Sequence, residues 1–192
     1  LIHLINLINF YQNYKNVKLK IFSSKKTLDK INNHKFIEKK QINYFVESNF
    51  VIRLIWQKIF LNQNYLQNSD ILITLGGISF SGFKPSIVLC QNLLPFSKKQ
   101  YSKNKFINKI KLLAQSILYC KSFNNASGVV YMTEASRKII EDNNFVITSN
   151  NKVIHHGNDQ IVKNLRNYSK FYKSKSFKLL YVSRFQPYKN HF

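Results

Sequence analysis

The chain has 192 residues, of which 30 are Lys or Arg and 8 are Asp or Glu, so its formal net charge is +22. This length suits one well-cored domain and excludes a complete enzyme of two ordinary domains. No apolar run approaches the roughly 20 residues that a membrane-spanning helix needs. The first residues already read as the middle of a helix, and the last ones open a new strand and loop. We therefore interpret the chain as a fragment.

The positive charge raises nucleic acid and anionic lipid as partners. Arginine, however, occurs only at Arg53, Arg137, Arg166 and Arg184, whereas phosphate and base recognition favour the bidentate guanidinium. Abundant Lys, Asn, Ile, Phe and Tyr are together typical of A+T-rich coding. We interpret most of the charge as solvated surface, with peripheral contact to an anionic membrane as a by-product and no specific nucleic acid as a partner.

The N-terminal residues alternate between helical and strand patterns. A helix is predicted by apolar side chains at i, i+3, i+4 and i+7, namely Leu4, Leu7, Ile8 and Tyr11. Residues 17–22 alternate apolar and Lys, as a strand does, and residues 42–46 form a second strand candidate. Residues 25–40 read as loop or weak helix. Because a helix leads directly into a strand, we expect another strand to precede that helix.

A second helix is predicted at residues 52–60, where Ile52, Ile55, Trp56, Ile59 and Phe60 recur at helical spacing. We interpret this face, with the only Trp, as core rather than as a ligand-stacking surface.

Two apolar runs then end in turn residues. Residues 70–75 run into Gly76 and Gly77, and residues 86–90 run into Gln91 and Asn92. Paired glycines serve either as a bare turn or as a place where a sugar or phosphate approaches the backbone. Asn92 reads equally as an Asx-turn residue or as a cleft residue.

The remaining elements continue the alternation. Apolar residues spaced along 107–118 predict a long helix with Lys on its other faces, and residues 128–132 predict a buried strand. Thr133 is a suitable N-cap for a helix over 134–142, and residues 152–155 read as a further strand. His155 and His156 point to opposite faces of a strand, so they do not chelate one ion together.

Cys90 and Cys120 are isolated, without metal-ligand spacing or a disulfide framework, and read as small core residues in a reducing compartment. Residues 161–176 are polar and Lys-rich, which is typical of an interdomain linker. Beyond it, residues 179–182 predict a buried strand, with Arg184 and Lys189 at its carboxyl end. Cations there suit an anionic group such as a diphosphate, although a solvated loop fits these residues equally well.

Strands alternating with helices predict an α/β fold with a Rossmann-like, doubly wound parallel sheet. Four segments in order resemble GT-B glycosyltransferases of family 4. They are Ser86-Ile-Val-Leu-Cys-Gln-Asn-Leu-Leu-Pro-Phe96, Val129-Val-Tyr-Met-Thr-Glu-Ala-Ser-Arg-Lys138, Val153-Ile-His-His-Gly-Asn-Asp159 and Leu179-Leu-Tyr-Val-Ser-Arg-Phe-Gln-Pro-Tyr-Lys-Asn-His191. The resemblance covers the chain from about Asp70 onward.

The resemblance implies a domain organisation and a set of site residues. Residues 1–160 would form the acceptor-side domain without its start, 161–176 a linker, and 177–192 the beginning of the nucleotide-sugar donor domain. Arg184 and Lys189 would bind the donor diphosphate. Many family members have a His where this chain has Asn92, so Asn92 would position substrate rather than transfer a proton. The cleft would be lined by Gly76, Gly77, Gln91, Asn92, Ser136, Arg137 and Gly157.

The resemblance further implies a retaining enzyme that transfers a sugar from a nucleotide-sugar donor to a glycan or lipid-linked acceptor. No Asp-x-Asp motif suggests a metal site, and no cofactor is expected. The family's paired glutamates would lie beyond Phe192, so we expect the fragment alone to be inactive. Cytoplasmic action at the inner membrane face would follow. Two alternatives stay open, which are a basic module that binds nucleic acid or anionic surfaces, and another GT-B-like nucleotide-sugar enzyme such as an epimerase.

Overall fold

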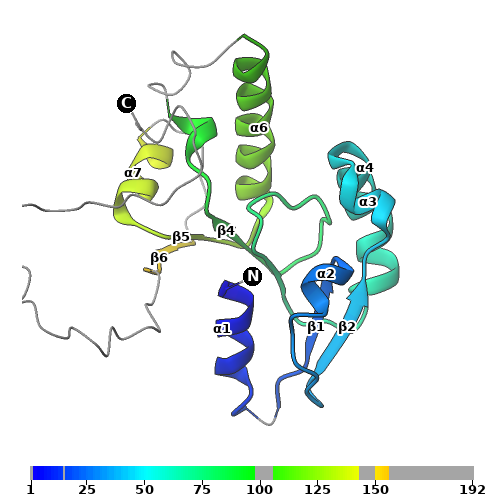
Figure 1. Cartoon of the computed structure of the whole chain (residues 1–192). Coiled ribbons are helices and arrows are strands. Elements are labelled where there is room, and N and C mark those ends of the chain that lie inside the picture. Colours follow the sequence, from blue (N-terminus) through cyan, green and yellow to red (C-terminus); the bar gives the residue numbers. More distant parts are fainter. Residues whose placement is uncertain (1, 15, 98–105, 143–149, 156–192) are drawn as a thin grey trace, which may run out of the picture.

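The computed structural model describes residues 2–14, 16–97, 106–142 and 150–155. Within these residues the chain is an α/β protein whose strands pair in parallel (Figure 1). Its strands form two sheets, one with the order β1-β2 and one with the order β3-β4-β5-β6. The parallel α/β class is therefore confirmed, whereas the single continuous sheet expected from the sequence is divided in two.

The strands are β1 (Leu19–Ser23), β2 (Ile37–Gln41), β3 (Leu72–Thr74), β4 (Ser86–Cys90), β5 (Gly128–Tyr131) and β6 (Asn151–Val153). The helices are α1 (Ile2–Tyr11), α2 (Lys25–Leu28), α3 (Tyr44–Ser48), α4 (Phe50–Trp56), the π-helix η1 (Gln57–Tyr65), the 3-10 turn η2 (Leu94–Phe96), α6 (Phe106–Asn125) and α7 (Glu134–Glu141).

The four-stranded sheet carries the main core. Alternate residues of β4 and β5 turn toward α6 and α7, which lie on the same side of this sheet (Figure 1). Val88 and Tyr131 are completely buried there, as are Phe123 of α6 and Ile140 of α7. Such side chains exclude water from the middle of the layer, where each contributes about 1.5–3 kcal/mol of burial free energy.

Helix α6 packs through an unexpected face. Its buried residues are Ser116, Tyr119, Ser122 and Phe123, whereas the apolar stripe that marked the helix in the sequence is exposed, with Ile110 54%, Leu113 54% and Ile117 59% accessible. The prediction of a helix is confirmed, and its apolar stripe is exposed rather than buried. Small Ser side chains let α6 approach the sheet closely, which hydrophobic periodicity does not register.

The two-stranded sheet has a smaller core of its own. Ile8 of α1 packs with Ile21 of β1, Leu28 of α2 and Ile31 in one buried cluster. Both helices therefore cover the same face of this sheet. Lys20 and Phe22 alternate to the opposite face, where the Phe22 ring lies 5.7 Å from that of Tyr65 in η1.

The prediction of a strand at residues 42–46 is wrong. Asn43 is the N-cap of α3, and its Oδ1 accepts a hydrogen bond from the backbone N–H of Phe45 at 3.0 Å. The second strand lies earlier, at Ile37–Gln41, within the stretch read as loop or weak helix. Its polar sequence is tolerated because β2 is an edge strand of this sheet, with mostly exposed or half-buried residues.

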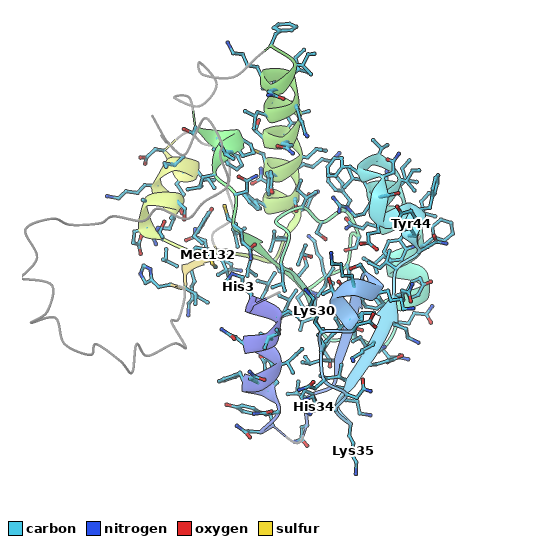
Figure 2. All side chains as sticks on the ribbon, viewed as in Figure 1. His3, Lys30, His34, Lys35, Tyr44 and Met132 are labelled. Atoms are coloured by element: carbon cyan, nitrogen blue, oxygen red, sulfur yellow. The ribbon has the colours of Figure 1, made fainter. Side chains whose placement is uncertain are left out.

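The helix predicted at residues 52–60 is present, but its apolar face is not core. Helix α4 has no buried residue in the described structure, and Ile55, Ile59 and Phe60 are about half exposed. Trp56 is half-buried and its ring lies 5.5 Å from that of Tyr65. In the preceding helix α3, Tyr44 is 79% exposed and projects outward (Figure 2).

Candidate functional site

The candidate site lies at the carboxyl ends of the strands of the four-stranded sheet. Because β3, β4, β5 and β6 pair in parallel, the turns that follow them lie along one edge of the sheet. In open α/β sheets this edge is where ligands bind. It carries the glycine pair after β3, Gln91 and Asn92 after β4, and Thr133 after β5.

The turn after β3 depends on glycine at one position. Gly77 is buried and adopts φ +78°, a conformation that residues with a side chain rarely adopt. A Cβ added there would collide with the Tyr119 ring and would lie 3.2 Å from the carbonyl oxygen of Leu89. Gly76 is exposed, and a Cβ added to it would contact nothing within 4 Å. Of these two glycines, only Gly77 approaches α6 closely.

Two hydrogen bonds hold the loop that continues from Gly77. The backbone N–H of Ser79 donates to Ser122 Oγ in α6 at 2.8 Å. The backbone N–H of Phe80 donates to Gln57 Oε1 at the start of η1 at 3.3 Å. Lys121 Nζ lies 5.9 Å from the centre of the Phe80 ring, within range of a cation–π contact. This loop thus bridges α6 and η1.

The turn after β4 presents an amide at the same edge. Gln91 is exposed and Asn92 is half-buried. Asn92 Oδ1 accepts a hydrogen bond from the backbone N–H of Leu94 at 3.1 Å, which is the Asx-turn arrangement. Its side chain also lies close enough to the Tyr119 phenol to lower the pKa of that phenol. The Asx-turn interpretation of Asn92 is therefore confirmed, whereas its role as a cleft residue stays a prediction.

Tyr119 connects these turns, and the sequence pattern did not single it out. Burial raises the pKa of its phenol, against a smaller lowering by the Asn92 hydrogen bond. The hydroxyl is therefore neutral at physiological pH and acts as a hydrogen-bonding group rather than as a base. We call Gly77, Asn92 and Tyr119 the Asn92 cluster. An amide and a phenol both donate and accept hydrogen bonds, and Asn92 is the more accessible of the two because Tyr119 is 7% exposed and belongs to the core cluster.

After β5, Thr133 and Ser136 together cap the N-terminus of α7. Thr133 Oγ1 accepts a hydrogen bond from the Ser136 backbone N–H at 3.0 Å, and Ser136 Oγ accepts one from the Thr133 backbone N–H at 3.2 Å. This reciprocal capping box confirms the predicted N-cap at Thr133. Ser136 is 3% exposed, so its hydroxyl faces its own helix end.

The guanidinium of Arg137 is engaged within the same helix. Its Nη2 lies 3.0 Å from Glu134 Oε2, and its Nε lies 3.7 Å from Glu141 Oε2. These partners sit one turn before and one turn after it on α7. Both carboxylates are partly exposed, so each contact contributes only about 0.3–0.5 kcal/mol. The pairs orient Arg137 along α7 and partly neutralise it.

The other residues that the sequence analysis discussed do not join this cluster. His155 is exposed after β6, whereas His156, Gly157, Arg184 and Lys189 lie outside the described residues. Burial raises the pKa of the Cys90 thiol to about 12, so Cys90 is a core residue and not a nucleophile at neutral pH. Within the described ranges no group of three or more His, Cys, Asp or Glu side chains could hold a metal ion.

One hollow in the described part of the chain lies away from the Asn92 cluster. It opens between α2 and β2 and is lined by Lys25, Leu28, Asp29, Ile31, Asn32, Asn33, Lys39 and Gln41. Lys39 Nζ donates there to Asn33 Oδ1 at 2.6 Å, which ties its ammonium to the hollow's own wall. We favour the sheet edge over this hollow because the edge gathers turns from several strands.

None of the helices that the structure describes is long and apolar enough to cross a bilayer. Comparisons of this chain with protein-family models, with curated protein sequences and with solved structures found no match.

Proposed function

We propose that the chain belongs to a retaining, metal-independent glycosyltransferase of the GT-B type. It would supply the acceptor-side domain and the first strand of the donor domain. The enzyme would transfer a sugar from a nucleotide-sugar donor to a glycan or lipid-linked acceptor, on the cytoplasmic side of the membrane. The observation that carries the proposal is the Asn92 cluster. It brings together an amide, a phenol and a glycine that packs against the phenol ring, at the turns that follow β3 and β4 of a parallel sheet.

The Asn92 cluster supports a binding role rather than acid-base chemistry. The Asn92 amide does not titrate, and burial keeps the Tyr119 phenol protonated. Neither group takes a proton from an acceptor hydroxyl at neutral pH. The half-buried Asn92 amide can hold a sugar hydroxyl in place, which accelerates transfer by orientation, and the buried Tyr119 phenol lies beside it in the core. The flanking Gln91, exposed at the same edge, is available to the same ligand.

The donor side of the proposal rests on the sequence. Arg184 and Lys189 would bind the diphosphate and neutralise the charge that develops on the departing nucleotide. Arg suits this role because its guanidinium binds phosphate oxygens in a bidentate manner. Gly157 would form the crossover turn beneath the cleft. Ser136 and Arg137 would border the cleft through α7 without reaching the reacting groups.

The proposal is tested with Arg184→Ala combined with Lys189→Ala in the full-length enzyme. Release of nucleotide from a panel of nucleotide-sugars measures turnover. We expect kcat/KM to fall on the order of 100-fold or more, because two cationic groups at the developing charge are lost. Lys170→Ala combined with Lys173→Ala removes the same charge from the predicted linker and should leave turnover unchanged. Undiminished turnover by a folded Arg184 and Lys189 double variant would contradict the assignment.

The same assay separates the alternative enzyme class. A transferase releases nucleotide and elongates an acceptor, whereas an epimerase converts the sugar without an acceptor. Product analysis by chromatography therefore decides between them.

The net charge of +22 favours a second candidate, a module that binds nucleic acid or anionic surfaces. Such binding would be tight and would weaken steeply with salt. Filter binding of DNA and RNA at 50 and 200 mM salt tests it, and we expect weak, nonspecific retention.

A further inference from the structure

One lysine of the two-stranded sheet lies on the face that the helices cover. Lys39 of β2 is level with Ile21 of β1 in the parallel register, and side chains at paired positions point to the same face of a sheet. Ile21 packs on that face with Leu28 of α2 and with Ile31. Lys39 is half-buried there, at a position where a covered sheet face favours an apolar residue.

The neighbouring charges of β2 point to the other face. Glu38 and Lys40 alternate away from the helices, and Lys40 Nζ lies 2.9 Å from Glu38 Oε1. Lys39, by contrast, takes part in none of the ion pairs that the described part of the chain forms. The strand thus carries a neutralised lysine on its outer face and a lysine without a carboxylate partner on its covered face.

Two neutral oxygen atoms orient the Lys39 ammonium. Its Nζ donates to the carbonyl oxygen of Ile31 and to Asn33 Oδ1, the latter at 2.6 Å. An ammonium group has three N–H bonds, so one of them remains for another acceptor. Because neither acceptor is charged, the half-buried cation gains most from an anion as its third partner. Lys39 is therefore an oriented cation with a place for an anionic ligand.

A hollow lies in front of this ammonium. Helix α2 stands over β1 and β2 (Figure 1), and α2, residues 29–33 and β2 enclose a hollow of about 600 Å³. This volume is in the range of sites that bind small organic molecules. Leu28 and Ile31, which are both buried, form the apolar part of its wall.

The polar part of the wall suits a phosphorylated polyol. Lys25 contributes a second ammonium to the hollow, and two cations suit the nearly two negative charges that a phosphate monoester carries at neutral pH. Asp29, Asn32 and Gln41 also line it, with exposed side chains. Carboxylate and amide groups bind hydroxyl groups, so the hollow offers partners for both ends of such a ligand.

We propose that this hollow binds a small phosphorylated polyol, such as a sugar phosphate. The remaining N–H of Lys39 and the ammonium of Lys25 bind the phosphate group. The side chains of Asp29, Asn32 and Gln41 bind the hydroxyl groups. The hollow belongs to the two-stranded sheet, whereas the Asn92 cluster belongs to turns of the four-stranded sheet. This inference is therefore independent of the proposed transferase activity.

Isothermal titration of the full-length protein tests the ligand class. The probes are glucose 6-phosphate and glycerol 3-phosphate, with glucose, glycerol and inorganic phosphate for comparison. We expect at least one phosphate ester to bind about 10-fold or more tightly than its parent polyol and than inorganic phosphate, because only the ester offers both the charge and the hydroxyl groups.

Each lysine of the hollow has a neighbour in the chain that serves as its control. Lys39→Gln removes a charge from the hollow, whereas Lys40→Gln removes the same charge from the opposite face of β2. Lys25→Gln and Lys26→Gln form a second pair on α2, where both lysines are exposed and only Lys25 lines the hollow. We expect Lys39→Gln to weaken binding of the ester about 10-fold and Lys25→Gln about 3-fold, and both controls to change it less than about 2-fold.

The two pairs keep the test decisive. Because Lys25 is exposed, its replacement tests the site even where Lys39→Gln impairs folding. Equal weakening within both pairs would assign the binding to the net charge of +22 and overturn the proposal. A parent polyol that binds as tightly as its ester would also overturn it. Absence of binding by both esters would do so as well, and would leave Lys39 as an inward charge that keeps an edge strand from pairing with another chain.

Vesicles distinguish a soluble ligand from a lipid headgroup of the same chemistry. Sedimentation with phosphatidylcholine vesicles, with and without phosphatidylglycerol, compares Lys39→Gln with Lys40→Gln. We expect both variants to bind the anionic vesicles equally, because a headgroup diester carries one charge and a soluble monoester nearly two. A loss of vesicle binding in Lys39→Gln alone would support the same site, with the phosphorylated polyol of a lipid headgroup as its ligand.

Discussion

The two sheets of this protein bury apolar side chains to different degrees. In the four-stranded sheet, Val88, Val129 and Tyr131 are at most 1% exposed, because β4 and β5 have strands on both sides and helices above them. In the two-stranded sheet, Ile21 remains 7% exposed and its cluster contains four buried residues. A parallel strand excludes water fully only where it has neighbours on both sides.

The largest expected effect comes from the core of the four-stranded sheet. Phe123→Ala removes a fully buried ring that packs against Phe96 and Tyr119. The neighbouring rings of Phe96 and Tyr119 belong to the same buried cluster, so we expect the vacated space to refill only in part. We expect the free energy of unfolding to fall by about 3–5 kcal/mol. Urea denaturation followed by circular dichroism measures it.

The matched change in the two-stranded sheet is Ile21→Ala. Its smaller cluster lies next to an open edge, so neighbours can relax and water can enter. We expect a loss of about 2 kcal/mol. A loss as large as that of Phe123→Ala would show that the two cores are equally tight.

Three glycines in the connection from β3 to β4 allow a comparison around the Asn92 cluster. Gly77→Ala forces a side chain into φ +78° and against the Tyr119 ring, so we expect a loss of about 1–3 kcal/mol. Gly82→Ala introduces the same kind of backbone strain at φ +69° in open space and should cost about 1 kcal/mol. Gly76→Ala should be nearly neutral. Thermal unfolding of the three variants ranks them, and a neutral Gly77→Ala would contradict the close approach.

The last expected effect appears only at alkaline pH. Burial raises the pKa of Cys90 from 9.0 to about 12 and that of Tyr131 from 10.0 to about 12. Between these values the unfolded chain has lost protons that the folded chain retains, so stability falls as pH rises from about 9 to 12. The stability that the protonated Cys90 and Tyr131 contribute is fully present below pH 9.

Unfolding midpoints measured from pH 8 to 11 test this dependence. Tyr131→Phe removes one titrating group and also a buried hydroxyl that has no hydrogen-bond partner among the described residues. We expect this variant to be at least as stable as the parent at pH 8 and to lose less stability at pH 11. A parallel decline of both proteins would assign the pH dependence to other groups.

The strands and helices with strong local signals were predictable. β4 matches its predicted bounds because five apolar or small residues stand between Pro85 and a polar turn, and Thr133 was recognisable as a cap. β2 was missed because its sequence is polar, and only pairing with β1 makes it a strand. Residues 42–46 have a strand-like sequence. The hydrogen bond from the Phe45 backbone N–H to Asn43 Oδ1 caps a helix there instead.

The candidate site was predictable only as separate turns. Gly77 and Asn92 stood out because each ends an apolar run. Tyr119 did not, because it lies in the middle of a long helix and reaches Asn92 only through the tertiary fold. The one local signal for Tyr119 is its place on the face of α6 that carries Ser116 and Ser122. Small residues at helical spacing indicate a closely packed helix face, just as hydrophobic residues do.

The exposed apolar stripe of α6 affects how the chain behaves in solution. Phe106, Ile110 and Ile117 would favour self-association, while a net charge of +22 keeps separate molecules apart. That repulsion acts over a Debye length of about 10 Å at 0.1 M salt and about 3 Å at 1 M. Colloidal stability of this protein is therefore highest in dilute buffer, and concentrated salt removes the barrier that protects the stripe.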